Sequence, residues 1–414
     1  KYYNGVIEQV AGGIGNVEHN SILVRYSNDF SIWDLESVNH YKDQTDIFFT
    51  CHEFSYNKIA EAYEPYLGLI RQMFHKYCSG TLEEFMEECD VYKLQRPVFE
   101  SYFEKGFCER TEQILIDEVE YEQERMHSSI VTMLQKLSEI CPIVIVLNRF
   151  QLASKSTMQL TNRLLQTENK NIGIVLGVND VQSIPEFAHE EWDAICESMD
   201  DRNMVYHIGN AGRNMEPDVM DYYSDYESDD GYRKLNNLVY FLDFDQADHH
   251  LSKIERRIKF DNFTISEKKH YQLLLLQIMV SVLQRDIAKA LESCEDLEKL
   301  QDQEKEGAFY YNFWMATSYM YLGKLEEAMI YVQKAKECGE ALGDDFLVFR
   351  AELLKAQNQM SGWCNIFFCA QDIEISDKLI EKLNAYHYKN HLAHIYIYAY
   401  DNKPEIVAKA YRSE

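Results

Sequence analysis

The chain has 414 residues, of which 46% are hydrophobic and 13% aromatic, so it can bury a substantial core and is not an intrinsically disordered chain. Its formal net charge of −28 repels phosphate backbones and anionic headgroups, which argues against nucleic acid or a membrane as its main partner. The length favours two domains. The ten cysteines contain no Cys-x-x-Cys pair, which indicates reduced thiols in a cytoplasmic protein.

The N-terminal segment predicts a short strand over residues 6–11, followed by a glycine-rich turn. A strand followed by such a turn is where a phosphate-binding loop of the form G-x-x-x-x-G-K-[ST] would lie. With Gly13 and Gly15 as that turn, Asn16 stands at the lysine position and Val17 at the hydroxyl position. The sequence therefore offers Gly13, Gly15 and Asn16 as degenerate nucleotide-site positions.

A second strand is predicted over residues 46–51, and a helix over residues 59–77. Pro65 is expected near the start of that helix, because proline lacks the amide hydrogen that an interior position donates. Apolar residues recurring every three or four positions then predict further helices over residues 82–137.

A strand–helix–strand unit follows over residues 142–180. Its two apolar runs, residues 143–147 and 172–178, are rich in Ile and Val, which is typical of strands buried on both faces of a parallel sheet. Because ligands of such sheets bind at the carboxyl ends of the strands, Asn148 and Asn179 mark the edge where a site is expected.

The remaining sequence predicts a change of architecture. After a strand at residues 204–208, residues 216–231 are acidic and weakly patterned, which favours an exposed loop or a boundary. Residues 235–414 then read as consecutive helices. We therefore expect an α/β domain over residues 1–232 and an all-α, helical-repeat domain over residues 233–414.

The helical half carries the spacing of a tetratricopeptide repeat. Ala316, Gly323, Ala328 and Ala335 lie at the offsets where that repeat has small residues at helix contacts and glycine at the turn. A looser copy precedes it, with Ala290 in the position of Ala328.

Together these pieces resemble the signal-transduction ATPases with numerous domains, called STAND proteins, which have an AAA-like P-loop core followed by helical repeats. In that family the strand matching residues 143–147 ends in two acids, where this chain has Asn148 and Arg149. The following Gln-x-Ala-Ser pattern, which here begins at Gln151, is retained. The segment 63–66 also looks like the family's PY-x-P helix.

The resemblance implies a P-loop NTPase-like parallel sheet in a bacterial signalling protein, with any output domain outside this chain. A magnesium–nucleotide site needs an acid at the strand end and a cation on the terminal phosphates. Asn148 is uncharged, Arg149 would repel the metal, and Asn16 replaces the lysine. We therefore expect a pseudo-ATPase that is not an enzyme and has no cofactor.

The partner expected from the repeats is another protein, bound through the helical-repeat face, with oligomerisation left open. The alternative is a STAND-type switch that binds ATP or ADP through the backbone of residues 12–15, aided by basic residues between 200 and 260. A remoter alternative is a metal-dependent hydrolase that uses His387, His391 and His394, which share one face of a helix. Packing and surface histidines are the preferred interpretation.

Overall fold

The computed structural model describes residues 2–15, 20–26, 46–55, 58–92, 95–108, 119–167, 169–179, 184–202, 204–208, 225–226, 228–261, 263–361 and 378. The chain divides into two compact units. One, the α/β unit, comprises residues 1–111 and 118–250, and the other, the helical unit, comprises residues 112–117 and 251–414. The division falls inside helix α11 (Phe244–Phe260), beyond the boundary expected at residue 232.

The α/β unit contains a five-stranded parallel sheet with the strand order β2-β3-β4-β1-β5. The strands are β1 (Ser21–Tyr26), β2 (Phe48–Glu53), β3 (Ile143–Asn148), β4 (Ile172–Asn179) and β5 (Val205–Ile208). Every residue of β3 and β4 is buried, which confirms the double-sided burial expected from their Ile and Val runs. The parallel sheet is confirmed, and so are the four strands predicted at the positions of β2, β3, β4 and β5.

The strand expected at residues 6–11 is wrong, because this segment lies in helix α1 (Tyr2–Gly12). Val6, Ile7 and Val10 are buried and share one helical face. That face packs on β4 at Gly173, where an added Cβ would lie 2.6 Å from Cγ1 of Val10. Three apolar residues within five positions, at 6, 7 and 10, do not decide between strand and helix, and here the packing against the sheet decides for the helix.

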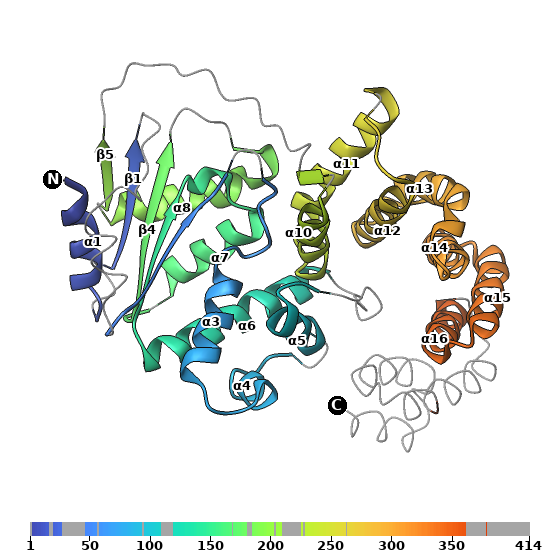
Figure 1. Ribbon diagram of the computed structural model, residues 1–414, viewed down its shortest axis with the longest axis horizontal. Helices are drawn as coiled ribbons and strands as arrows, with labels where there is room; N and C mark the ends of the chain where they lie inside the picture. The colour runs from blue at the N-terminus through green and yellow to red at the C-terminus, as the bar shows by residue number, and fades with distance from the viewer. Residues whose placement is uncertain are drawn as a thin grey trace. The chain divides into compact units, whose positions relative to one another are not determined.

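The helices that follow β2 lie on the opposite side of the sheet from α1 (Figure 1). They are α3 (Tyr66–Tyr77), α4 (Leu82–Glu88), α5 (Arg96–Lys105) and α6 (Val119–Ile140) between β2 and β3, then α7 (Lys155–Gln166) and α8 (His189–Asp201). All the connections from β2 to β5 run in one direction across the sheet, so right-handed crossovers place their helices on a single face. Pro65 immediately precedes α3, as predicted, although the helix is shorter than expected.

Aromatic packing explains why the α/β unit extends past residue 232. Helix α10 (Asp229–Tyr240) is followed by Phe241, which is fully buried. The ring of Phe241 makes edge-to-face contacts with Phe99 at 5.7 Å and Tyr102 at 5.5 Å, both on α5. These contacts hold the end of α10 in the core of the α/β unit.

The helical unit is built from stacked helices. They are α12 (Glu267–Leu283), α13 (Ile287–Lys299), α14 (Gly307–Tyr321), α15 (Leu325–Leu342) and α16 (Asp345–Ser361), and they follow one another in a curved row (Figure 1). Gly323, with φ of 72°, forms the turn between α14 and α15 as expected. The small residues predicted at the helix contacts are fully buried: Ala290, Ala316, Ala328 and Ala335.

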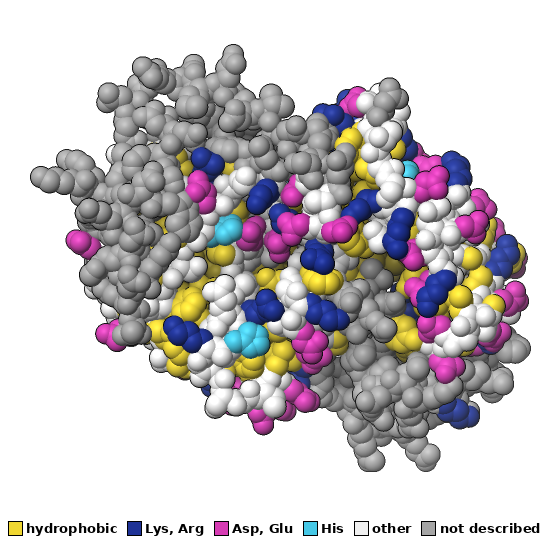
Figure 2. Space-filling model, in the orientation of Figure 1, with side chains coloured by type: hydrophobic (Ala, Val, Ile, Leu, Met, Phe, Trp, Pro, Cys, Tyr) yellow, Lys and Arg dark blue, Asp and Glu magenta, His cyan; other side chains and the backbone are white. Residues whose placement is uncertain are grey.

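On the face seen in Figure 2, Lys and Arg side chains lie interspersed among Asp and Glu side chains. Among the helices of the described part, none combines the length and apolarity needed to span a bilayer. The cysteines within the described ranges are free thiols.

Candidate functional site

The strand order puts the switch point of the sheet, where open α/β sheets form their ligand crevice, between β1 and β4. These two strands are parallel neighbours, and their last residues, Tyr26 and Asn179, are register partners. From β1 the chain continues to β2 at one edge of the sheet, whereas from β4 it continues to β5 at the other edge. Adjacent strands whose connections leave in opposite directions mark the point where open α/β sheets bind ligands.

Asn148, at the end of the next strand β3, is 1% exposed. The hydroxyl of Tyr26, at the end of β1, donates to Oδ1 of Asn148 at 2.9 Å. The amide Nδ2 of Asn148 is buried and has no hydrogen-bond partner among the described residues. A buried donor left without an acceptor costs about 1–3 kcal/mol, so this orphan marks Asn148 as the part of the edge that can receive a ligand atom or a water.

The loop after β3 closes the edge with neutral and paired groups. Arg149 adopts a left-handed backbone conformation with φ of 55°, which turns the chain into the 3₁₀ turn η3 (Phe150–Leu152). The guanidinium of Arg149 then lies 3.5 Å from the carboxylate of Glu53, at the end of β2. In η3, Gln151 is buried and its Oε1 accepts the backbone N–H of Asn179 at 3.2 Å.

A neutral histidine lies beside this pair. Burial lowers the pKa of His52 to about 4, partly offset by the carboxylate of Glu53. His52 is therefore uncharged at neutral pH, so its contact of 3.3 Å with Glu64 is not an ion pair. Burial also raises the pKa of Glu64.

The Gln-x-Ala-Ser segment that begins at Gln151 has a structural role at the start of α7. Ser154 is the N-cap of α7, and its Oγ accepts the backbone N–H of Thr157. The backbone N–H of Ser156, in the same first turn, donates to the buried carboxylate of Asp243 at 2.8 Å. Burial raises the pKa of Asp243 to about 6. The pattern therefore positions α7 behind the crevice.

The structure does not bring the predicted nucleotide-site residues together. Gly13 and Gly15 follow a helix rather than a strand, and the N–H of Gly15 donates to the carbonyl of Lys170, just before β4. The turn therefore lies at the amino edge of the sheet, whereas Asn148 lies at the carboxyl edge. The expectation that Gly13 and Gly15 form a phosphate loop facing Asn148 is wrong, and Asn16 lies outside the described residues.

In a P-loop fold the phosphate-binding loop follows the first strand of the sheet, which in this chain is β1. The segment that follows β1, residues 27–45, contains no glycine, so it lacks the residue that lets a backbone approach phosphate closely. Its structure lies outside the described residues.

In the described part of the chain, no group of three or more His, Cys, Asp or Glu side chains is placed to hold a metal ion. His250 is buried and hydrogen-bonded to Tyr226 and Gln246, which makes it a packed histidine. His387, His391 and His394 lie outside the described residues.

Sequence reasoning missed Tyr26 and Glu53 as members of this site. Tyr26 ends the segment Ser-Ile-Leu-Val-Arg-Tyr, which contains a short apolar stretch like those of β3 and β4. That stretch could have been used to predict an interior strand. Glu53 lies two residues beyond the predicted end of β2, and its register partner is Asn148. Extending that strand to its last residue would have identified it.

The arrangement offers hydrogen bonds to a ligand but little charge. β1, β3 and β4 end in Tyr26, Asn148 and Asn179, so none of these three strands supplies a carboxylate at its last residue. The nearby carboxylate of Glu53 is paired with Arg149. No protein-family model, no curated protein and no solved structure matches this chain.

Proposed function

We propose that this chain is a non-catalytic signalling or regulatory scaffold, with a pseudo-ATPase α/β unit of the STAND kind and a tetratricopeptide-like helical unit that binds another protein. The observation that carries the proposal is the end of β3, where Asn148 replaces an acid and Arg149 is paired with Glu53. A metal-bound nucleotide requires a free carboxylate at that position, to hold the ion and to orient the attacking water.

Two further features support the proposal. The segment that follows β1 contains no glycine, so the usual backbone cradle for phosphates is not encoded there. In the helical unit, α14 packs against both α15 and α16 through buried aromatic, aliphatic and alanine side chains, which is the neighbour-to-neighbour construction of repeat proteins. Such repeats present an extended binding face and carry no chemistry of their own.

Calorimetric titration of the full chain with Mg-ATP and with Mg-ADP tests the first half of the proposal. We expect no saturable heat and no phosphate release above the buffer rate. An active P-loop ATPase measured in parallel provides the positive control. Binding with a micromolar dissociation constant, or steady hydrolysis, would contradict the pseudo-ATPase and favour the nucleotide-dependent switch.

Comparison of two surface variants of the full chain tests the second half. Ile330 on α15 and Tyr121 on α6 are 56% and 64% exposed, so neither substitution disturbs a core. We expect Ile330→Glu to abolish co-purification of a partner from the native cell, and Tyr121→Glu to retain it. Loss with Tyr121→Glu alone would transfer partner binding to the α/β unit.

A further inference from the structure

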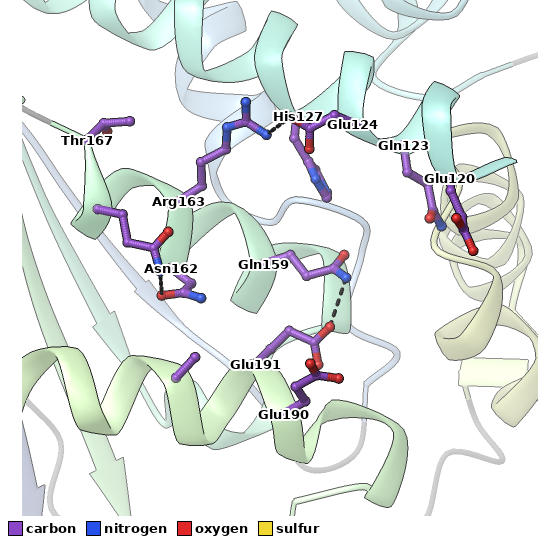
Figure 3. A pocket seen from close by; sticks show the side chains of 12 residues that line it. Glu120, Gln123, Glu124, His127, Gln159, Asn162, Arg163, Thr167, Glu190 and Glu191 are labelled. Carbon is purple, nitrogen blue, oxygen red and sulfur yellow. Dashed lines mark hydrogen bonds and ion pairs between the residues drawn. The ribbon is translucent and has the colours of Figure 1, made fainter.

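A polar groove with a volume of about 610 Å³ runs over the outer surface of α7, between α6 and α8 (Figure 3). Each helix contributes residues from one face, at spacings of three, four or seven, which is the pattern of a surface stripe. The lining comes almost entirely from charged and amide side chains: Glu120, Gln123, Glu124, His127, Gln159, Asn162, Arg163, Gln166, Thr167, Glu190, Glu191 and Ala194. The groove belongs wholly to the α/β unit and is separate from the carboxyl edge of the sheet.

The charges that line the groove are unbalanced. Four carboxylates face one guanidinium, that of Arg163, which is paired with Glu124 at 2.5 Å. Glu191 accepts the amide of Gln159 at 2.9 Å and lies 3.8 Å from the ammonium of Lys155, which is not among the lining residues. Glu120 and Glu190 form no ion pair with any described residue and are exposed, so their oxygens are available to a ligand. The net charge of −28 on the chain adds to this local preference for cations.

The floor of the groove carries an unsatisfied polar atom. His127, on α6, is 8% exposed, and its Nε2 has no hydrogen-bond partner among the described residues. Its ring points from α6 toward Gln159 on α7 (Figure 3) and packs edge-to-face on Tyr63 at 5.5 Å. Burial and the charge of Arg163 lower the pKa of His127 to about 4, so the ring is neutral at pH 7 and one ring nitrogen can accept a hydrogen bond.

We propose that the groove between α6, α7 and α8 binds an extended organic cation that donates hydrogen bonds, with its ammonium or guanidinium groups on Glu120 and Glu190 and a donor on Nε2 of His127. The carboxylates come from separate helices and form no metal-holding cluster in the described part of the chain. Figure 3 shows Glu120 and Glu190 on different helices on either side of α7, an arrangement that suits a chain with spaced ammonium groups. The same chemistry is offered by a free polyamine and by a lysine or arginine side chain of a peptide.

Calorimetric titration of the full chain with spermidine, with a lysine-containing tripeptide blocked at both ends, and with Mg²⁺ tests the proposal. We expect saturable heat with at least one of the two organic cations. The cation that binds more tightly identifies the source, a free polyamine or a protein side chain. Equal or stronger binding of Mg²⁺ would overturn the assignment to an organic cation, and absence of saturable heat with both organic cations would overturn the site.

Two charge-matched double variants separate the groove from the general negative field. Glu120→Gln with Glu190→Gln removes two groove carboxylates, and we expect roughly tenfold weaker binding, about threefold for each exposed pair. Glu139→Gln with Glu197→Gln removes two exposed carboxylates of the same helices outside the groove and should leave the affinity unchanged. Equal weakening by both double variants would show that the field alone attracts the cation and would overturn the site.

The ¹⁵N resonance of His127 Nε2 provides a readout that does not depend on charge. We expect this resonance to shift on saturation with the organic cation, while the resonances of His189, outside the groove, stay in place. His127→Phe keeps the ring packed on Tyr63 and should weaken binding at least threefold, consistent with the loss of one hydrogen bond. An unchanged His127 resonance at saturation would remove this residue from the site. Because no nucleotide is involved, these outcomes are independent of those that test the pseudo-ATPase.

Discussion

In the α/β unit, several buried side chains bond to the backbone of elements distant in the sequence, whereas in α14 of the helical unit they bond within their own helix. Asp243 accepts the N–H of Ser156 at 2.8 Å, and Asn237 accepts the N–H of Cys108 at 2.9 Å. In α14, by contrast, Thr317 donates to the carbonyl of Phe313, one turn earlier, at 2.9 Å.

This difference shows what each kind of burial specifies. A hydrogen bond between a side chain and a distant backbone group fixes a loop in one place, as the end of a strand beside a binding crevice requires. A hydrogen bond within one helix satisfies the polar atom but positions nothing else, so the arrangement of α14 and its neighbours depends on apolar packing. The α/β unit is therefore sensitive to polar substitutions, and α14 to changes of volume. In the helical unit α16 is also tied to α15 by a hydrogen bond, which Asn358 donates to the carbonyl of Leu325 at 3.0 Å.

The largest effect is expected from a volume change in the helical unit. Phe309 is fully buried and stacks on Phe313 at 5.7 Å. Phe309→Ala should lower the free energy of unfolding of the helical unit by about 3–5 kcal/mol, because the cavity cannot close completely. Hydrogen exchange of the α14 and α15 amides measures this. The exposed Ile330→Ala is the control, and a comparable loss there would refute the packing argument.

A pH effect of roughly 3 kcal/mol is expected from Glu61 in the α/β unit. Burial, and secondarily the charge of Glu64, raise its pKa from 4.5 to about 7 in the folded protein. Between these values the folded state holds more protons than the unfolded state, so the contribution of Glu61 to stability falls as pH rises from 4.5 to 7. Relative to wild type, Glu61→Gln should gain stability over this range in urea titrations. Exposed Glu139→Gln should show no such trend, and parallel curves for wild type and Glu61→Gln would contradict the burial.

The bond between Tyr26 and Asn148 tests the polar construction of the crevice directly. Tyr26→Phe leaves both amide atoms of Asn148 without a partner among the described residues, and should cost about 1–3 kcal/mol. Urea unfolding of the α/β unit measures the loss. Tyr121→Phe, at an exposed position, provides the matched control. A neutral result for Tyr26→Phe would mean that the crevice is not held by this bond.

The smallest expected loss of stability comes from removing a helix cap, and the two units differ in how deeply their caps are buried. Ser154 caps α7 from a fully buried position, whereas Ser266 caps α12 at the surface of the helical unit. Ser154→Ala should cost about 2 kcal/mol and Ser266→Ala about 0.5 kcal/mol, the two ends of the usual range for caps. Thermal unfolding of both variants gives the order. A reversed order would contradict the greater dependence of the α/β unit on buried polar groups.

Much of the sheet can be predicted from the sequence, because β3 and β4 are short apolar segments rich in Ile and Val, which is typical of strands buried on both faces. The N-terminal element could not be assigned by the same rule. Val6, Ile7 and Val10 are compatible with a strand of five residues. The helix is explained by its packing on β4, where Gly173 leaves room for the side chain of Val10. The crevice was located from Asn148 and Asn179, but its partners depend on register and on strand order, which local patterns do not contain.

The position of β1 between β4 and β5 has a consequence for biosynthesis. Ser21 pairs with Ile174, so 153 positions separate the two halves of this ladder. At about 5–20 residues per second, the ribosome releases β4 roughly 8–30 s after β1. During that interval the run Ser-Ile-Leu-Val-Arg-Tyr has neither of its neighbouring strands. A nascent chain of this protein therefore exposes an aggregation-prone segment, which chaperone binding at the exit tunnel would protect.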